Sequence, residues 1–84
     1  MPFEILYHPD VKLYDLQNID KKTREKIKNV IEKRLRVAPQ HYGKPLRKTL
    51  KGYWKLRVGD YRVVFKISGD EIWILGIIHR KDVY

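Results

Sequence analysis

Two arginines, Arg57 and Arg62, flank the dipeptide Gly59-Asp60 in a run of alternating apolar residues. A Gly-Asp pair in this setting is typical of a two-residue β-hairpin turn. Such a turn places Arg57 directly opposite Arg62 on the neighbouring strand, with Lys55 two residues away on the same face. Like charges in opposite positions destabilise a sheet, whereas a bound phosphate matches the planar fork of arginine. The spacing therefore predicts an anion site on this hairpin.

The charge of the whole chain also indicates an anionic partner. The 84 residues include 19 Lys and Arg against 10 Asp and Glu, a net charge of +9. Residues 43–84 hold 10 basic and 4 acidic residues, a net of +6, and residues 1–42 hold 9 and 6, a net of +3. The excess is greater in the half that contains the paired arginines. A nucleic acid or an acidic protein is the kind of partner that this balance indicates.

Several other classes of protein are disfavoured by the sequence. The chain has no cysteine, which excludes disulfides and thiolate metal sites and favours the cytoplasm. The N-terminus lacks a signal-peptide pattern, and no apolar run approaches the roughly 18–20 residues of a membrane span. The three histidines lack metal-ligand spacing, and phosphate-loop and Ser-His-Asp signatures are absent. We therefore expect one cytoplasmic domain over residues 1–84, with no cofactor and no membrane contact.

Two helices are predicted after an N-terminal strand over residues 3–7. The first begins near Pro9, which suits a first helical turn. It turns three side chains inwards: Val11, Tyr14 and Leu16. The second spans roughly residues 20–37 and is capped by Asp20. Its inward stripe follows helical spacing: Ile27, Val30, Ile31 and Leu35.

The remaining residues predict an antiparallel meander. Residues 38–45 form a loop by their Pro and Gly content, residues 46–50 a short strand, and residues 53–58, 60–67 and 71–79 three paired strands. One face of the central hairpin is apolar and packs on the helices: Trp54, Leu56, Val58, Tyr61, Val63 and Phe65. The other face is basic: Lys55, Arg57, Arg62 and Lys66, with Val64 among them. The fold class is α+β, with the N-terminal strand and two helices packed on one face of an antiparallel sheet of about four strands.

The turn of the last hairpin leaves two registers open. A two-residue turn, Gly69-Asp70, puts Arg62 opposite Ile77 and brings His79 onto the basic face. Because the strand over residues 71–79 is apolar on both sides, its pattern does not decide between this register and the alternative. The alternative differs by one residue, which exchanges the two faces of the strand.

A three-residue turn over residues 68–70 puts Arg62 opposite Gly76 and brings Arg80 onto the basic face. We prefer this register, because it places a small residue beside Arg62 and adds Arg80 to the basic cluster. The choice also decides whether Arg80 or His79 faces the anion.

Two segments of the chain resemble a known family. Residues 50–62 read LKGYWKLRVGDYR and residues 79–84 read HRKDVY, and both are similar to the RelE branch of the RelE/ParE toxin superfamily. The order of strand, helix pair and sheet also matches that family. The resemblance implies a toxin of a type II toxin–antitoxin system. RelE toxins cleave mRNA in the ribosomal A site and are held inactive by an acidic antitoxin.

The resemblance also implies roles for five residues. Lys55 and Arg57 match the family's two basic positions on this strand, and Arg62 matches its phosphate-binding arginine. Arg80 matches the basic residue near the leaving group, and Tyr84 matches the C-terminal tyrosine, which would stack on a base or position the 2′-OH. Arg57 departs from members that carry lysine there. Because arginine is a poor proton shuttle, Lys55 is the better candidate base.

The chemistry that these residues would serve is attack of the RNA 2′-OH on the neighbouring phosphate. It requires removal of the 2′-OH proton, protonation of the leaving 5′-oxygen and stabilisation of the charged phosphorane. The basic cluster would stabilise the phosphorane without a metal ion. Histidine titrates near neutral pH, so His79 competes with Arg80 for the leaving group. Further RNA contacts are expected from five residues around the cluster: Lys48, Lys51, Lys66, His79 and Lys81.

The sequence leaves two other functions open. The ParE branch shares the fold and poisons DNA gyrase by protein contact, without cutting RNA. A non-catalytic RNA-binding domain would also explain the net charge of +9. The complete basic set and the ending at Tyr84 favour the RelE branch over the ParE branch. The paired arginines favour a RelE toxin over a non-catalytic RNA-binding domain.

Overall fold

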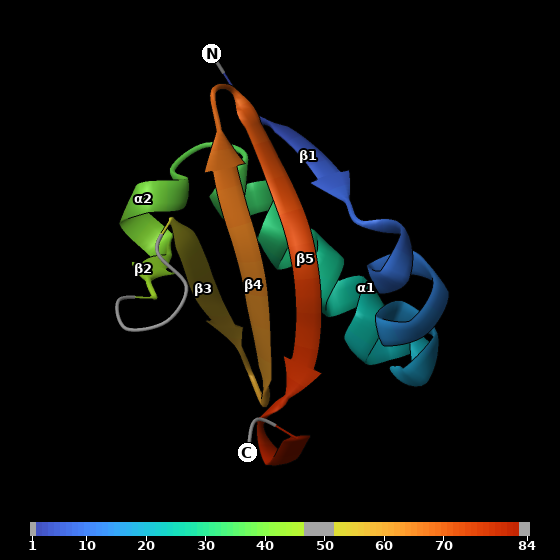
Figure 1. Ribbon diagram of the computed structural model, residues 1–84. Coiled ribbons are helices and arrows are strands. Elements are labelled where there is room, and N and C mark those ends of the chain that lie inside the picture. Colours follow the sequence, from blue (N-terminus) through green and yellow to red (C-terminus); the bar gives the residue numbers. More distant parts are fainter. Residues whose placement is uncertain (1, 47–51, 83–84) are drawn as a thin grey trace.

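A mixed β-sheet crossed on one face by a helix forms the framework of the protein. The computed structural model describes residues 2–46 and 52–82. Within them the strands form a five-stranded sheet in the order β1-β5-β4-β3-β2. The strands are β1 (Glu4–Tyr7), β2 (Lys44–Pro45), β3 (Tyr53–Val58), β4 (Tyr61–Ser68) and β5 (Glu71–His79). The α-helices are α1 (Lys21–Val30), which lies across one face of the sheet (Figure 1), and the short α2 (Pro39–Tyr42).

The α+β class and the meander of β3, β4 and β5 confirm the prediction, but the sheet is not wholly antiparallel. β1 runs parallel to β5, with Glu4 opposite Glu71 and Tyr7 opposite Ile74. The helical segment carries the chain from β1, at one edge, to β2, at the other (Figure 1). β5 is thereby paired on both sides, which suits its apolar sequence.

The long helix forms as its sequence predicts. The Asp20 carboxylate caps α1 by accepting a hydrogen bond from the Thr23 amide at 3.1 Å. Hydrogen bonding by the Thr23 side chain, and then by its amide, lowers the pKa of Asp20. Beyond Val30 the helix continues as one π-helical turn over Ile31–Leu35. The predicted inward stripe is confirmed: Ile27, Ile31 and Leu35 are buried, and Val30 packs against them.

The predicted first helix is instead a π-helical turn over Val11–Asp15 and a 3₁₀ turn over Leu16–Asn18. Val11 and Leu16 are buried as predicted, but Tyr14 is 62% exposed, so its inward placement is wrong. The Leu16 amide donates to the Val11 carbonyl, five residues back. This wider turn aligns residues 11 and 16 and rotates Tyr14 outwards.

The predicted loop over residues 38–45 contains α2 and β2. Pro39 occupies the first turn of α2, and β2 pairs with β3 through Lys44 opposite Lys55. Between them, a Cβ on Gly43 would lie 2.6 Å from Cζ of Phe65, so only glycine lets the chain pass this close to the core. Of the predicted strand over residues 46–50, the Leu46 amide donates to the Tyr53 carbonyl at 2.8 Å; residues 47–50 lie outside the described residues.

The hairpin of β3 and β4 has the predicted register. Arg57 lies opposite Arg62, and Val58 lies opposite Tyr61. Gly59 adopts a positive φ of 60° while Asp60 does not, which is the pattern of a type II′ turn. The apolar face of the hairpin is buried at Leu56, Val58, Val63 and Phe65, as predicted.

The pairing of β4 with β5 follows neither predicted register along its full length. Ser68 lies opposite Glu71, so the turn has two residues, and the preferred three-residue turn is wrong. A bulge then leaves Leu75 unpaired, since Phe65 lies opposite Ile74 and Val64 opposite Gly76. The extra residue shifts the rest of the strand by one position.

The consequence of this shift is that Arg62 lies opposite Ile78, and Tyr61 lies opposite His79. Arg80, two residues after Ile78, therefore follows the face of Arg62, whereas His79 lies on the face of the helices. The preferred placement of these two side chains is correct although the turn that we expected to produce it is not.

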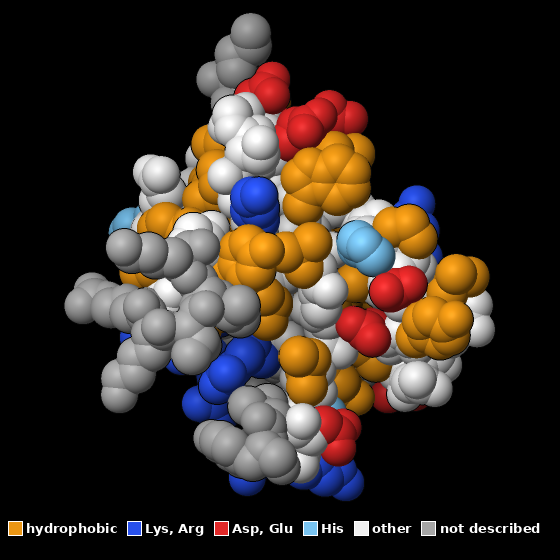
Figure 2. Space-filling view, in the orientation of Figure 1, with side chains coloured by type: hydrophobic (Ala, Val, Ile, Leu, Met, Phe, Trp, Pro, Cys, Tyr) orange, Lys and Arg blue, Asp and Glu red, His pale blue; other side chains and the backbone are white. Residues whose placement is uncertain are grey.

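The face of the sheet opposite α1 is basic only in part. Figure 2 shows hydrophobic side chains over its middle and Lys and Arg side chains toward its lower end, where β3 and β4 meet. Tyr53, Val64 and Ile78 are half-buried on this face. In the described residues, no helix is long and apolar enough to cross a membrane.

Tyr7, at the end of β1, has a buried hydroxyl group. The hydroxyl has no hydrogen-bond partner within the described residues. Burial, assisted by the nearby charge of Glu32 and opposed by that of Arg36, raises the pKa of Tyr7 from 10.0 to about 12. The folded state therefore keeps the phenolic proton at a pH where the unfolded state has lost it.

Tyr7→Phe is expected to remove this pH dependence. The folded state binds more protons than the unfolded state between pH 10.0 and about 12, so the free energy of unfolding falls as the pH rises through this range, by on the order of 2 kcal/mol. Urea unfolding at several alkaline pH values should show this fall in the wild type and in the exposed control Tyr14→Phe, and much less of it in Tyr7→Phe. Equal slopes in all three proteins would contradict the assignment.

Candidate active site

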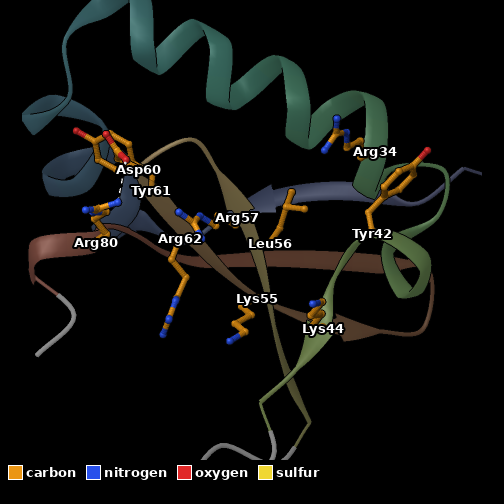
Figure 3. Close-up of a pocket in the computed structure, with 10 residues that line it drawn as sticks. All are labelled: Arg34, Tyr42, Lys44, Lys55, Leu56, Arg57, Asp60, Tyr61, Arg62 and Arg80. Atoms are coloured by element: carbon orange, nitrogen blue, oxygen red, sulfur yellow. Dashed lines mark ion pairs between the residues drawn. The ribbon is translucent and has the colours of Figure 1, made fainter.

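An open cleft follows the edge of the sheet along β3. Within the described residues β2 pairs only with Trp54 and Lys55, so the rest of β3 has no strand partner on that side. The cleft has a volume of about 590 Å³, and Figure 3 shows the side chains around it. They run from Asp60, Tyr61 and Arg80 at one end to Arg34, Tyr42 and Lys44 at the other, with Lys55, Leu56, Arg57 and Arg62 between (Figure 3).

Four of the predicted catalytic residues line this cleft: Lys55, Arg57, Arg62 and Arg80. The alternation of β3 and the register of the hairpin place the first three. Lys55 and Arg62 are half-buried, whereas Arg57 and Arg80 are exposed. The fifth, Tyr84, lies outside the described residues. The structure thus brings together four side chains that come from three strands or strand ends.

Contacts to the hairpin turn hold two of these arginines. The Arg57 Nε donates to the Gly59 carbonyl at 3.3 Å. The Arg80 amide donates to the Asp60 carbonyl at 2.7 Å, and its Nη1 lies 3.7 Å from the Asp60 carboxylate. The chain after β5 is therefore tied to the turn of the other hairpin, which keeps Arg80 at the mouth of the cleft.

The electrostatics of the cleft favour an anion. Among its described lining residues six are basic and one, Asp60, is acidic. The opposed Arg57 and Arg62 have no carboxylate within ion-pair distance in the described part of the chain. Guanidinium groups held in this way bind a phosphate and stabilise the additional charge of a phosphorane.

Three of the other predicted RNA contacts, Lys66, His79 and Lys81, lie outside the cleft. His79 meets the ring of Tyr61 edge-on, with centroids 4.9 Å apart, and its Nδ1 accepts a hydrogen bond from the Lys81 amide at 3.2 Å. Both His79 and Lys81 line a second hollow beside Asp15 and Ile19. Lys66 is exposed outside the cleft. Lys48 and Lys51 lie outside the described residues.

At the far end of the cleft lie three residues that the sequence did not predict as site residues: Arg34, Tyr42 and Lys44. Arg34 follows the helical pattern of a solvent-facing residue, and Tyr42 and Lys44 come from a segment expected to be a loop. Only the packing of the helix end against α2 and β3 brings them to the cleft. Across residues 2–46 and 52–82, no three His, Cys, Asp or Glu side chains form a group that could hold a metal ion.

This fold is that of the toxins of type II toxin–antitoxin systems. The family model described as ParE toxin of type II toxin-antitoxin system, parDE, matches residues 5–84. The chain belongs to the RelE/ParE toxin superfamily.

Individual relatives agree with this assignment. Toxin RelE3 of Methanocaldococcus jannaschii is 33% identical to this chain over 73 residues, which cover 83% of each protein. A chain of the RelBE2 toxin-antitoxin complex from Mycobacterium tuberculosis has a TM-score of 0.88 and 26% identity, over 95% of this chain and 93% of that chain. A mutant of E. coli RelE in the free state has a TM-score of 0.77 and 13% identity, over 99% of this chain and 88% of that chain. This likeness supports the fold.

Proposed function

We propose that this toxin is an endoribonuclease that cleaves mRNA on the ribosome by metal-independent attack of the 2′-OH. The observation that carries the proposal is the convergence of Lys55, Arg57, Arg62 and Arg80 on one cleft. These positions match the basic positions of the RelE branch, and they provide a candidate base and the positive charge that stabilises the phosphorane and the leaving group.

The roles follow from the position of each side chain. Arg57 and Arg62, opposite each other, clamp the phosphate and stabilise the phosphorane. Lys55, two residues along the same strand, accepts the proton of the 2′-OH. Arg80, tied to the turn by Asp60, lines the same cleft and neutralises the charge that develops on the leaving 5′-oxygen, which takes its proton from water.

Purified toxin added to translating ribosomes tests the proposal. We expect mRNA cuts that leave 5′-OH ends, since attack by the 2′-OH expels the 5′-oxygen. Arg62→Ala provides the control, because it should remove the cuts without unfolding the protein. RNA that is bound but never cut would contradict the proposal and favour a non-catalytic RNA-binding domain.

The second candidate is the inhibition of DNA gyrase by protein contact. It is favoured by one observation, the description of the matching family model as a ParE toxin. DNA breaks that depend on gyrase, together with intact mRNA, would establish this function in place of RNA cleavage. Both assays should therefore be run with the same preparation.

We also propose that an acidic antitoxin binds over the basic cleft, as the net charge of +9 indicates. Similar structures include toxin-antitoxin complexes from Mycobacterium tuberculosis and Methanococcus jannaschii. Complementary charge accelerates association and makes it dependent on salt.

The association rate with the cognate antitoxin is expected to fall by roughly tenfold or more as the ionic strength rises from low to several hundred millimolar. Stopped-flow or surface-based kinetics measures this rate. The double variant Lys55→Ala/Arg62→Ala should show a shallower dependence on salt. An association rate that does not change with salt would rule out electrostatic steering.

A further inference from the structure

The end of the cleft farthest from Arg80 contains an aromatic side chain in a cationic setting. The Arg34 guanidinium carbon lies 5.4 Å from the centroid of the Tyr42 ring, and Tyr42 is 44% exposed. Lys44, the first residue of β2, lines the same end of the cleft (Figure 3). These three residues take no part in the chemistry proposed above.

Arg34 differs from the other arginines of the helical segment. The Arg36 Nε donates to Glu32 at 2.9 Å, and Arg24 donates to the Leu16 carbonyl at 3.3 Å. The Arg34 side chain has neither an ion pair nor a hydrogen bond in the described part of the chain, and its guanidinium group lies over the Tyr42 ring. A guanidinium plane over a tyrosine ring extends the flat surface on which a nucleobase can stack.

The position of Tyr42 is fixed by the fold. The Tyr42 amide donates to the Ala38 carbonyl at 3.1 Å, and His41 meets the Tyr42 ring edge-on, with centroids 4.9 Å apart. The next residue, Gly43, lies against Phe65 of the core. The ring is therefore presented to the cleft in one place, which lowers the entropy lost when a base binds.

We propose that Tyr42 and Arg34 form a nucleotide-binding subsite. A base of the single-stranded RNA, flanking the phosphate held by Arg57 and Arg62, stacks on this pair, and Lys44 contacts a neighbouring phosphate. The subsite rests on the proposed ribonuclease function, and it would position the RNA along the cleft and contribute to the choice of the cleavage point. The lining fits a polynucleotide, because six of its ten side chains are basic and they occur at both ends of the cleft.

A series of substitutions at Tyr42 tests stacking. Steady-state cleavage of ribosome-bound mRNA should show a rise in KM of about 5- to 100-fold for Tyr42→Ala, the range expected for loss of one stacked base, with kcat changed much less. Tyr42→Phe and Tyr42→Trp should keep a low KM, whereas Tyr42→Leu should behave as Tyr42→Ala does, because it keeps an apolar side chain without a flat ring. Arg34→Ala should also raise KM, with less effect from Arg34→Lys.

Two exposed residues outside the cleft serve as matched controls, Tyr14→Ala and Lys28→Ala. Both should leave KM near the wild-type value. A short RNA that carries 2-aminopurine and a 2′-O-methyl group at the cleavage point gives a second measurement, since it binds without being cut. Its fluorescence should be quenched on wild-type toxin and less so on Tyr42→Ala.

The outcomes separate the subsite from the function on which it rests. If Arg62→Ala abolishes cleavage while Tyr42→Ala changes neither KM nor oligonucleotide binding, the subsite is refuted and the ribonuclease function stands. If the wild type cuts no RNA, that function fails, and the 2-aminopurine quenching alone decides the subsite. If Tyr42→Ala weakens only the binding of the acidic antitoxin, this end of the cleft is a protein interface and the subsite is refuted.

Discussion

Arg62→Ala is expected to lower the rate of RNA cleavage by about 100- to 1,000-fold, the effect of removing one donor that stabilises a transition-state charge. Arg62 is half-buried between β3 and β5, so water screens its charge less than that of exposed Arg57. Arg57→Ala should therefore also lower the rate, but by a smaller factor. The measurement is single-turnover cleavage of ribosome-bound mRNA.

The same substitutions are expected to leave the melting temperature unchanged or raise it, because each one removes the repulsion between two guanidinium groups in opposite positions. Lys66→Ala is the matched control: it removes a positive charge from the same face of the same strand, outside the cleft. It should cleave at nearly the wild-type rate. Near-normal cleavage by both arginine variants would show that the clamp is not the site of the reaction.

Arg80→Ala is expected to reduce cleavage by two orders of magnitude or more, with little change in melting temperature, since its side chain is 69% exposed and an ion pair of this kind contributes little to stability. His79→Ala is expected to lower the stability of the protein and to change cleavage little. Loss of its contact with Tyr61 should cost on the order of 1 kcal/mol of unfolding free energy, while most of the activity remains.

Lys81→Ala controls for the loss of charge next to Arg80, because Lys81 lies in the second hollow and not in the cleft. Cleavage rates, thermal melts and pH–rate profiles of the three variants decide the question together. If His79→Ala is the inactive variant, and an acidic limb of the wild-type pH–rate profile disappears with it, then His79 protonates the leaving group and the role proposed for Arg80 is wrong.

The sequence by itself determined those features that depend on neighbouring residues. The pair of Arg57 and Arg62 followed from a two-residue Gly-Asp turn, because a tight turn fixes the register of the strands that it joins. The cap at Asp20 and the buried stripe of α1 followed in the same way from local hydrogen bonding and helical spacing. These local rules were enough to predict the α+β class and the opposed pair of arginines.

Tyr14 marks one limit of those rules. Its predicted inward position assumed 3.6 residues per turn, and the π-helical turn over Val11–Asp15 changed that spacing. The sequence likewise did not predict the parallel pairing of β1 with β5. The partner of β1 depends on the path that the chain takes through the helical segment, which local rules do not specify.

Only the tertiary structure decided which side chains complete the cleft. The bulge at Leu75 turns Arg80 toward Arg62 and His79 toward the helices, and a strand that is apolar on both faces carries no periodic signal to predict it. Arg34 and Tyr42 line the same cleft as Arg57 because α2 packs against the end of the helix and leads into β2, which pairs with β3. Contacts of this kind join segments distant in sequence and arise from the packing of whole elements around a shared core, which no local pattern of residues encodes.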